Sequence, residues 1–150
     1  MSADLVLAIL HHLGVFTVAG IIAAEWALVR PEMDLGKIRQ VSKIDTLYGM
    51  AAGLVLLVGF ARVFFGPRGA EFYLQNPVFW AKIGAFIAVG VLSIPPTMLF
   101  MAWRNNAKAD PSFLPSADEI ASVRRYVKME AHIFILIPIL AAAMARGYGL

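Results

Sequence analysis

Apolar residues dominate four stretches of the chain, and these stretches are separated by three loops that are more polar. The stretches are residues 5–29, 46–65, 78–103 and 126–148, each of 20 residues or more. A helix needs about 20 apolar residues to cross the hydrocarbon core of a bilayer, whereas a transmembrane β-barrel would show short alternating segments. The pattern therefore predicts an all-α fold, a transmembrane four-helix bundle that forms a single domain over residues 1–150.

The loops carry signals for helix ends. Asp34 is a candidate N-cap for a short interfacial helix within residues 30–45, because apolar residues alternate there with charges. Ser116 and Glu119 have the spacing of a capping box, so we expect a helix to begin there and continue into the fourth span. Prolines inside the third and fourth spans predict kinks at Pro95, Pro96 and Pro138.

Composition agrees with a membrane protein, since 60% of the residues are hydrophobic and only 15% are charged. A soluble domain has about 25% charged residues. The absence of cysteine excludes disulfides, thiolate metal sites and iron–sulfur clusters. The net charge of +3 does not indicate nucleic-acid binding, because the basic residues lie in loops beside the spans.

The basic residues also predict the orientation of the chain. Loops one and three hold nine of them: Arg30, Lys37, Arg39, Lys43, Arg104, Lys108, Arg124, Arg125 and Lys128. The opposite side holds four: Arg62, Arg68, Lys82 and Arg146. Because positive charge accumulates in cytoplasmic loops, we expect a multi-pass protein of a bacterial-type inner membrane with both termini outside the cytoplasm. The first span is interpreted as uncleaved, since no basic region precedes it.

Two adjacent histidines, His11 and His12, lie inside the first span. An imidazole in hydrocarbon is costly unless it faces protein, a metal or a cofactor. His11 and Glu25 are 14 residues apart and therefore lie within about 40° of each other around the helix. A stripe that faces the bundle should hold such polar groups together, so we expect His11 to face inward. His12 remains the alternative and can face a second subunit.

Haem b is the ligand class that best fits this end of the bundle. At 1.5 Å per residue, His11 lies about 9 Å below the outer end of its helix. Arg62 and Lys82 lie near the outer ends of their spans, and Trp80 is close in sequence. Haem needs an axial imidazole, an apolar slot and cations for its propionates. We predict that His11, or else His12, ligates iron, and that Arg62 and Lys82 bind propionates or an anionic substrate. The alternative is that the cations snorkel to headgroups and the histidines bond across helices.

A second group of polar residues lies toward the other end of the bundle: Glu25, Asp45, Glu130 and His132. His132 lies about 24 Å from the outer end of its helix, which is about 15 Å deeper than His11. The two histidines therefore cannot bind one iron. Three alternatives follow: the iron bound by His11 is five-coordinate, another ligand such as Met144 completes its coordination, or a second site exists deeper in the bundle. Glu25, Glu130 and His132 are candidates for a second haem, a metal ion or a proton relay, and the alternative is an interfacial charge network.

Three short motifs resemble one family. Residues 7–20, with His11 ahead of a pair of small residues, resemble the first helix of HemJ-type protoporphyrinogen IX oxidases and the related CopD-like membrane proteins. Trp80 and Lys82 are similar to the signature that opens the third helix of those oxidases, and residues 125–132 resemble the stretch before their last helix. The resemblance implies a haem b-binding four-helix bundle, often a homo-oligomer, with redox activity on a porphyrinogen. It also implies that His11 is an axial ligand and Lys82 an essential membrane cation.

The chain departs from that pattern at four positions: His12, Glu25, Met129 and His132. These departures favour an uncharacterised branch of predicted membrane proteins within the same superfamily. We expect a homodimer that binds haem b and takes part in electron transfer or in oxidation of a porphyrinogen-like or quinone substrate. Two rival functions remain, a small transporter or metal-handling protein with His11, Glu25 and His132 along its path, and a structural membrane subunit.

Overall fold

The computed structural model describes residues 3–149, which form helices and loops with no strand among them. The helices are α1 (Ala3–Leu28), α2 (Leu35–Phe65), α3 (Gly69–Leu74), α4 (Pro77–Ala109), α5 (Ala117–Phe134) and α6 (Leu136–Ala145). Four helical segments are long and apolar enough to cross a membrane, namely α1, α2, α4 and the consecutive pair α5–α6. The predicted all-α class with four candidate spans is confirmed.

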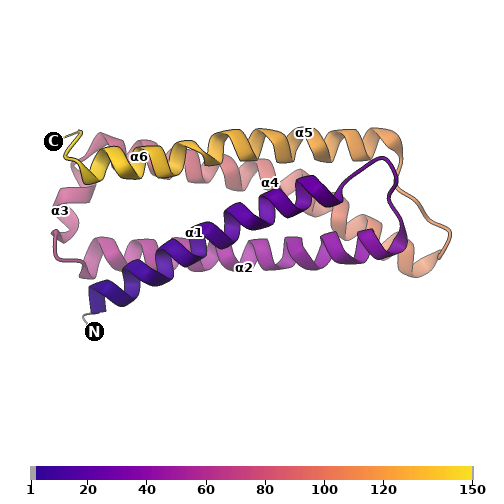
Figure 1. Cartoon of the computed structure of the whole chain (residues 1–150), viewed down its shortest axis with the longest axis horizontal. Coiled ribbons are helices and arrows are strands. Elements are labelled where there is room, and N and C mark those ends of the chain that lie inside the picture. The colour runs from indigo at the N-terminus through magenta and orange to yellow at the C-terminus, as the bar shows by residue number, and fades with distance from the viewer. Residues whose placement is uncertain (1–2, 150) are drawn as a thin grey trace.

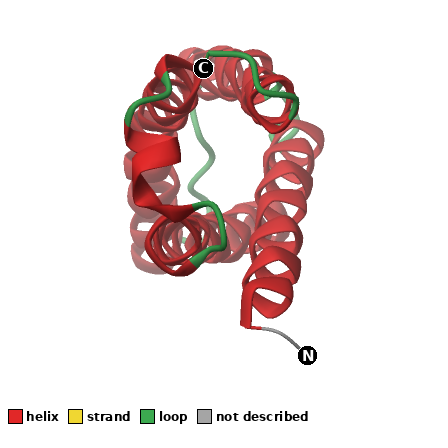
Figure 2. Cartoon of the chain, turned by 90° about the vertical axis from the view of Figure 1, so that its left-hand side faces the viewer, coloured by secondary structure: helices red, strands yellow, loops and turns green. Residues whose placement is uncertain are grey.

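The four spans form an antiparallel bundle whose two ends differ (Figures 1 and 2). Both chain ends and α3 lie at one end, here called the terminal end, and the α1–α2 and α4–α5 loops lie at the other, the loop end (Figure 1). Helix α1 packs against α2 and α5, and α4 packs against α2, α5 and α6. The backbones of α1 and α6 do not approach each other closely within the described residues, because α1 runs diagonally across the bundle and diverges from α6 toward the terminal end (Figure 1).

Helix α2 starts where the sequence predicted a helix, but it is longer than predicted. The Asp34 side chain caps it by accepting a hydrogen bond from the Lys37 backbone N–H at 2.8 Å. Helix α2 is continuous over 31 residues, so the prediction of a separate interfacial helix was wrong. Ile38 and Val41 are fully buried in the protein core, and this burial fixes the first turns of α2 against the bundle instead of the membrane surface.

The fourth span is interrupted once, as its proline predicts. The Ser116–Glu119 capping box is present at the start of α5. The helix is broken at Ile135, between α5 and α6, because Pro138 has no N–H to donate to the Phe134 carbonyl. Helix α4 stays continuous through its two prolines. The short helix α3 was not predicted.

The core is concentrated at the loop end. Its fully buried large side chains include Trp103, Phe100, Val123 and Val127. At this end the Arg124 guanidinium donates a hydrogen bond to the Val29 carbonyl and tethers α5 to the end of α1. At the terminal end the described residues form a smaller core cluster, with Val63, Phe79 and Met144 as its buried members. The helices are therefore less closely packed at the terminal end.

Candidate functional site

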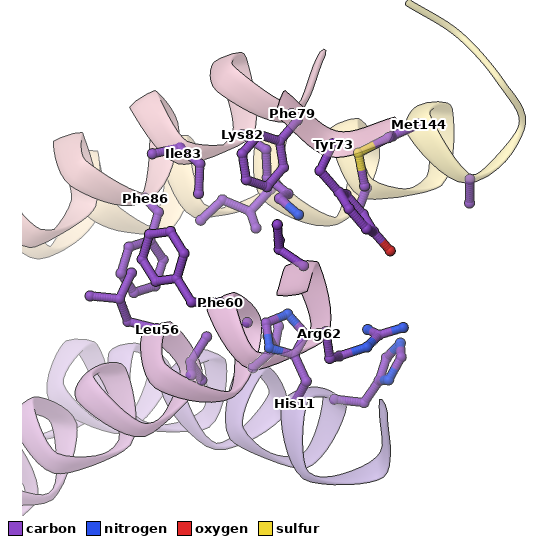
Figure 3. Close-up of a pocket in the computed structure, with 18 of the residues that line it drawn as sticks. His11, Leu56, Phe60, Arg62, Tyr73, Phe79, Lys82, Ile83, Phe86 and Met144 are labelled. Carbon is purple, nitrogen blue, oxygen red and sulfur yellow. The ribbon is translucent and has the colours of Figure 1, made fainter. Parts of the chain in front are cut away.

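A cavity of about 360 Å³ lies at the terminal end, between the helices that separate there (Figure 3). Its volume lies within the range of small-molecule pockets, about 300–1,000 Å³. Most of its walls are apolar side chains, among them Phe60, Phe79, Ile83, Phe86 and Met144. Its polar residues include His11, Arg62 and Lys82, which come from three different helices (Figure 3). We call this space the terminal-end cavity.

His11 enters the cavity from α1, next to a close approach between α1 and α2. A Cβ on Gly59 would lie 3.2 Å from Cε1 of His11, so the missing side chain leaves room for the ring. The backbone of Val55 also interacts with this ring. The Nδ1 atom of His11 is buried and has no hydrogen-bond partner within residues 3–149. Nδ1 is therefore withdrawn from water, and the Val55 backbone is the hydrogen-bonding group that lies close to the ring.

His12 has a different environment. It is exposed, and its Nδ1 lies 2.6 Å from the Ala8 carbonyl of its own helix. Its ring meets that of His11 edge to face, with centroids 6.3 Å apart, so it lies at the margin of the terminal-end cavity. Helical phase predicted that His11 faces inward, and the structure places the more buried ring there.

The exposed Arg68, between α2 and α3, also lines the cavity, and Arg62 on α2 and Lys82 on α4 bring two further positive charges to it. Both are half-buried, and each acts electrostatically on the other and on His11. Lys82 Nζ lies 5.2 Å from the centroid of the Phe79 ring, and Nε of Arg62 is buried without a hydrogen-bond partner. Neither cation forms an ion pair with a carboxylate in the described part of the chain. The site therefore has unbalanced positive charge suited to an anionic group.

Trp80, the remaining predicted cofactor residue, does not line the cavity. Its side chain is 54% exposed, and its Nε1 donates to the Leu74 carbonyl at 2.9 Å. Its neighbour Phe79 is buried in the cavity wall instead. The sequence contained this signal, because Phe79 lies three residues before Lys82 and shares its helix face, whereas Trp80 is two residues away and does not.

Three carboxyl groups are buried further along the bundle, and we call them the carboxyl cluster: Glu25, Asp45 and Glu130. They come from α1, α2 and α5. Tyr48 OH donates to Glu130 at 3.2 Å, and Thr97 Oγ1 donates to Asp45 at 2.6 Å. Asp45 and Glu130 both act electrostatically on Glu25. The structure therefore assembles the acidic part of the predicted inner group.

His132 is not part of this cluster. It is exposed, with Nδ1 2.6 Å from the Lys128 carbonyl of its own helix. Two residues of a helix turn by about 200°, so His132 points away from the face that carries Glu130. No group of three or more His, Cys, Asp or Glu side chains able to hold a metal ion occurs among the described residues. The metal-ion alternative for the inner group therefore has no ligand set there.

Sequence reasoning missed two residues that hydrogen-bond to the cluster, Tyr48 and Thr97. Tyr48 carried a usable signal, because it follows Asp45 by three residues on the same helix face. Thr97 carried none, since only the packing of α4 against α2 brings it to Asp45.

Comparison with known proteins identifies the family of the chain but does not indicate an activity. A family described as "Predicted membrane protein (DUF2214)" matches residues 3–149. No curated protein matches the chain, and no solved structure matches it. The match supports a membrane protein family without supporting the HemJ-type or CopD-like assignment. The chain belongs to the DUF2214 family of predicted membrane proteins.

Proposed function

We propose that this protein binds haem b in the terminal-end cavity and takes part in electron transfer or oxidation. One observation carries the proposal. A buried imidazole without a partner on Nδ1 and two cations without counterions line the same apolar cavity. A ligand that meets all three needs has a metal or a hydrogen-bonding group, a large apolar body and negative charge. Haem b has these properties together.

The residues present fit this group. His11 would ligate the iron through its imidazole, which is the commonest axial ligand of haem b proteins. The aromatic and aliphatic walls, including Phe60 and Phe86, would cover the macrocycle. Arg62 and Lys82 would pair with the propionates, and charge-assisted hydrogen bonds of this type are stronger than neutral ones.

Met144 would be a second residue able to hold the iron. It lines the cavity from α6, on the opposite wall from His11 (Figure 3), and a Met–His pair is an established haem ligation. His132 lies outside the cavity lining and cannot take this role. The bound group would supply one-electron chemistry, and the protein would orient it, exclude water and neutralise its carboxylates.

The transporter alternative finds less support. A path from His11 to Glu25 would have to pass Val18 and Ile22, which are 1% and 3% exposed and packed in the core. We also propose that the protein is a homodimer and that its substrate is porphyrinogen-like or a quinone. Exposed Phe16 and Trp26 share the face of His12 on α1, which is consistent with a second subunit there.

An absorption spectrum tests the proposal. The protein is produced with haem supplementation, purified in detergent and washed, and we expect a Soret band in proportion to protein. His11→Ala should lose the band, and His12→Ala is the matched control that should retain it. Arg62→Gln and Lys82→Gln should weaken haem retention. Gel filtration and circular dichroism verify that each variant is folded.

A colourless wild-type protein would overturn the proposal. Retention of the full spectrum by His11→Ala, with loss in His12→Ala, would contradict the assignment of the ligand.

A further inference from the structure

We propose that the carboxyl cluster is a proton-binding site, which takes up protons on Glu25, Asp45 and Glu130 and is separate from the terminal-end cavity. Uptake converts a carboxylate and a proton from water into a carboxylic acid, so each event removes one negative charge from the bundle interior. The proposal does not depend on what the cavity binds.

Burial is the first argument. Glu130, Glu25 and Asp45 are 1%, 3% and 8% exposed, and all lie in segments apolar enough to span a membrane. An isolated carboxylate in such surroundings costs so much free energy that the group takes a proton instead.

The charges nearby provide no compensation. On α1 and α5 the titratable groups that face the cluster are its own members, Glu25 and Glu130, and α2 adds Asp45 and Tyr48. Helix α4 contributes Thr97 and Ser93, which are neutral. The Arg104 cation of α4 lines the same groove as Asp45, but it does not act electrostatically on any member of the cluster. No member of the cluster forms an ion pair in the described part of the chain. Three adjacent carboxylates would therefore repel each other, and bound protons relieve this repulsion.

The environment of Glu25 indicates that the cluster binds a proton and not a metal ion. Its Oε1 atom is buried without a hydrogen-bond partner, although it lies within electrostatic range of Asp45 and Glu130. The described side chains offer no arrangement of ligands for a metal ion. A proton needs a single carboxyl oxygen and no coordination shell, so it is the cation that this arrangement can hold.

A groove between two helices reaches the cluster. It has a volume of about 620 Å³, lies between α2 and α4, and is lined by Asp45, Tyr48, Ser93 and Thr97. It extends along α4 from Gly90 to Arg104, toward the loop end. Tyr48 lines this groove and also donates to Glu130, so its hydroxyl connects the groove with the buried part of the cluster.

Labelling with dicyclohexylcarbodiimide tests the proposal, because this apolar reagent modifies protonated carboxyl groups inside membrane proteins. The detergent-purified protein is labelled between about pH 5 and about pH 9, a range that lies above the ordinary pKa of exposed carboxyls, and the sites are mapped by mass spectrometry. We expect Glu25 to be modified at neutral pH. Labelling should fall about tenfold per pH unit above the midpoint of the curve.

Variants make the test specific. Glu25→Gln should lose the label, and Asp45→Asn should shift the midpoint of labelling at Glu25 to lower pH, because it removes a neighbouring negative charge. Glu32→Gln is the control, since Glu32 is an exposed loop residue that should not be labelled in the wild type. His11→Ala should label like the wild type, which separates this test from the haem proposal.

Three outcomes would overturn the proposal. They are no modification of the cluster at any pH, modification of Glu25 no faster than of Glu32, and protection of Glu25 by sodium ions at constant pH. The last result would identify a site for a metal cation instead.

Discussion

His11 and His12 show how far a single helix can be interpreted from its residues. Helical phase alone separated the two rings, because Glu25 marks the face of α1 that turns toward the bundle. The same argument applied to α5 and α4 would have excluded His132 and Trp80, which lie two residues from Glu130 and Lys82. The contacts of Thr97, and the lack of any partner for Nδ1 of His11, depend on packing between helices and were beyond the sequence.

Two glycines on different faces of α2 allow a residue-scale prediction. A Cβ on Gly59 meets His11 at 3.2 Å, whereas a Cβ on Gly53 meets nothing within 4 Å. Alanine in place of a helical glycine stabilises a protein by about 0.5–1 kcal/mol. Gly53→Ala should therefore raise the stability by about this amount, and Gly59→Ala should gain less because the His11 ring must move.

Thermal unfolding of ligand-free protein in detergent measures this difference. Gly59→Val, with a larger side chain, should also displace His11 and reduce occupancy of the cavity by its ligand. An equal rise in stability for both alanine variants would show that the ring does not press on Gly59.

The ends of the helices were the elements most accessible from sequence. Caps are local, so Asp34 and the Ser116–Glu119 box could be identified from a few residues. The continuity of α2 was not local, because it depends on Ile38 and Val41 being buried by other helices. Helix α3 has only six residues, too few for a periodic pattern to indicate a helix.

The capping box gives a prediction for α5. Ser116→Ala removes the acceptor for the Glu119 backbone N–H and should lower stability by about 1 kcal/mol. Glu119→Gln should have little effect, since glutamine also closes a capping box. The midpoint of unfolding in mixed detergent micelles measures both, and equal losses in the two variants would assign the effect to the charge of Glu119.

At the scale of the whole molecule, the polar groups are sorted by depth. Arg62, Lys82 and His11 line the cavity at the terminal end, and three carboxyl groups are buried nearer the loop end. The sequence predicted this sorting because depth along a span follows directly from residue number. It did not predict the cavity, which lies where the backbones of α1 and α6 separate.

The absence of cysteine in the sequence makes the orientation easy to test. Gln75 and Ser112 are exposed at opposite ends of the bundle, so single Gln75→Cys and Ser112→Cys variants report each side. With both termini outside the cytoplasm, a membrane-impermeant maleimide should label Gln75→Cys in intact cells and Ser112→Cys only after permeabilisation. The reverse result would invert the orientation, and labelling of both in intact cells would contradict four spans.

The uneven distribution of the core has a mechanical consequence. Arg124, Trp103 and Phe100 hold the loop end together, whereas the first half of α1 is held chiefly by α2. Local openings have the lowest free energy where the fewest buried contacts must break. We therefore expect local opening to begin in the first half of α1, while the opposite end stays closed. Such an opening would face the hydrocarbon of the bilayer, so we expect a ligand of the terminal-end cavity to enter from the lipid.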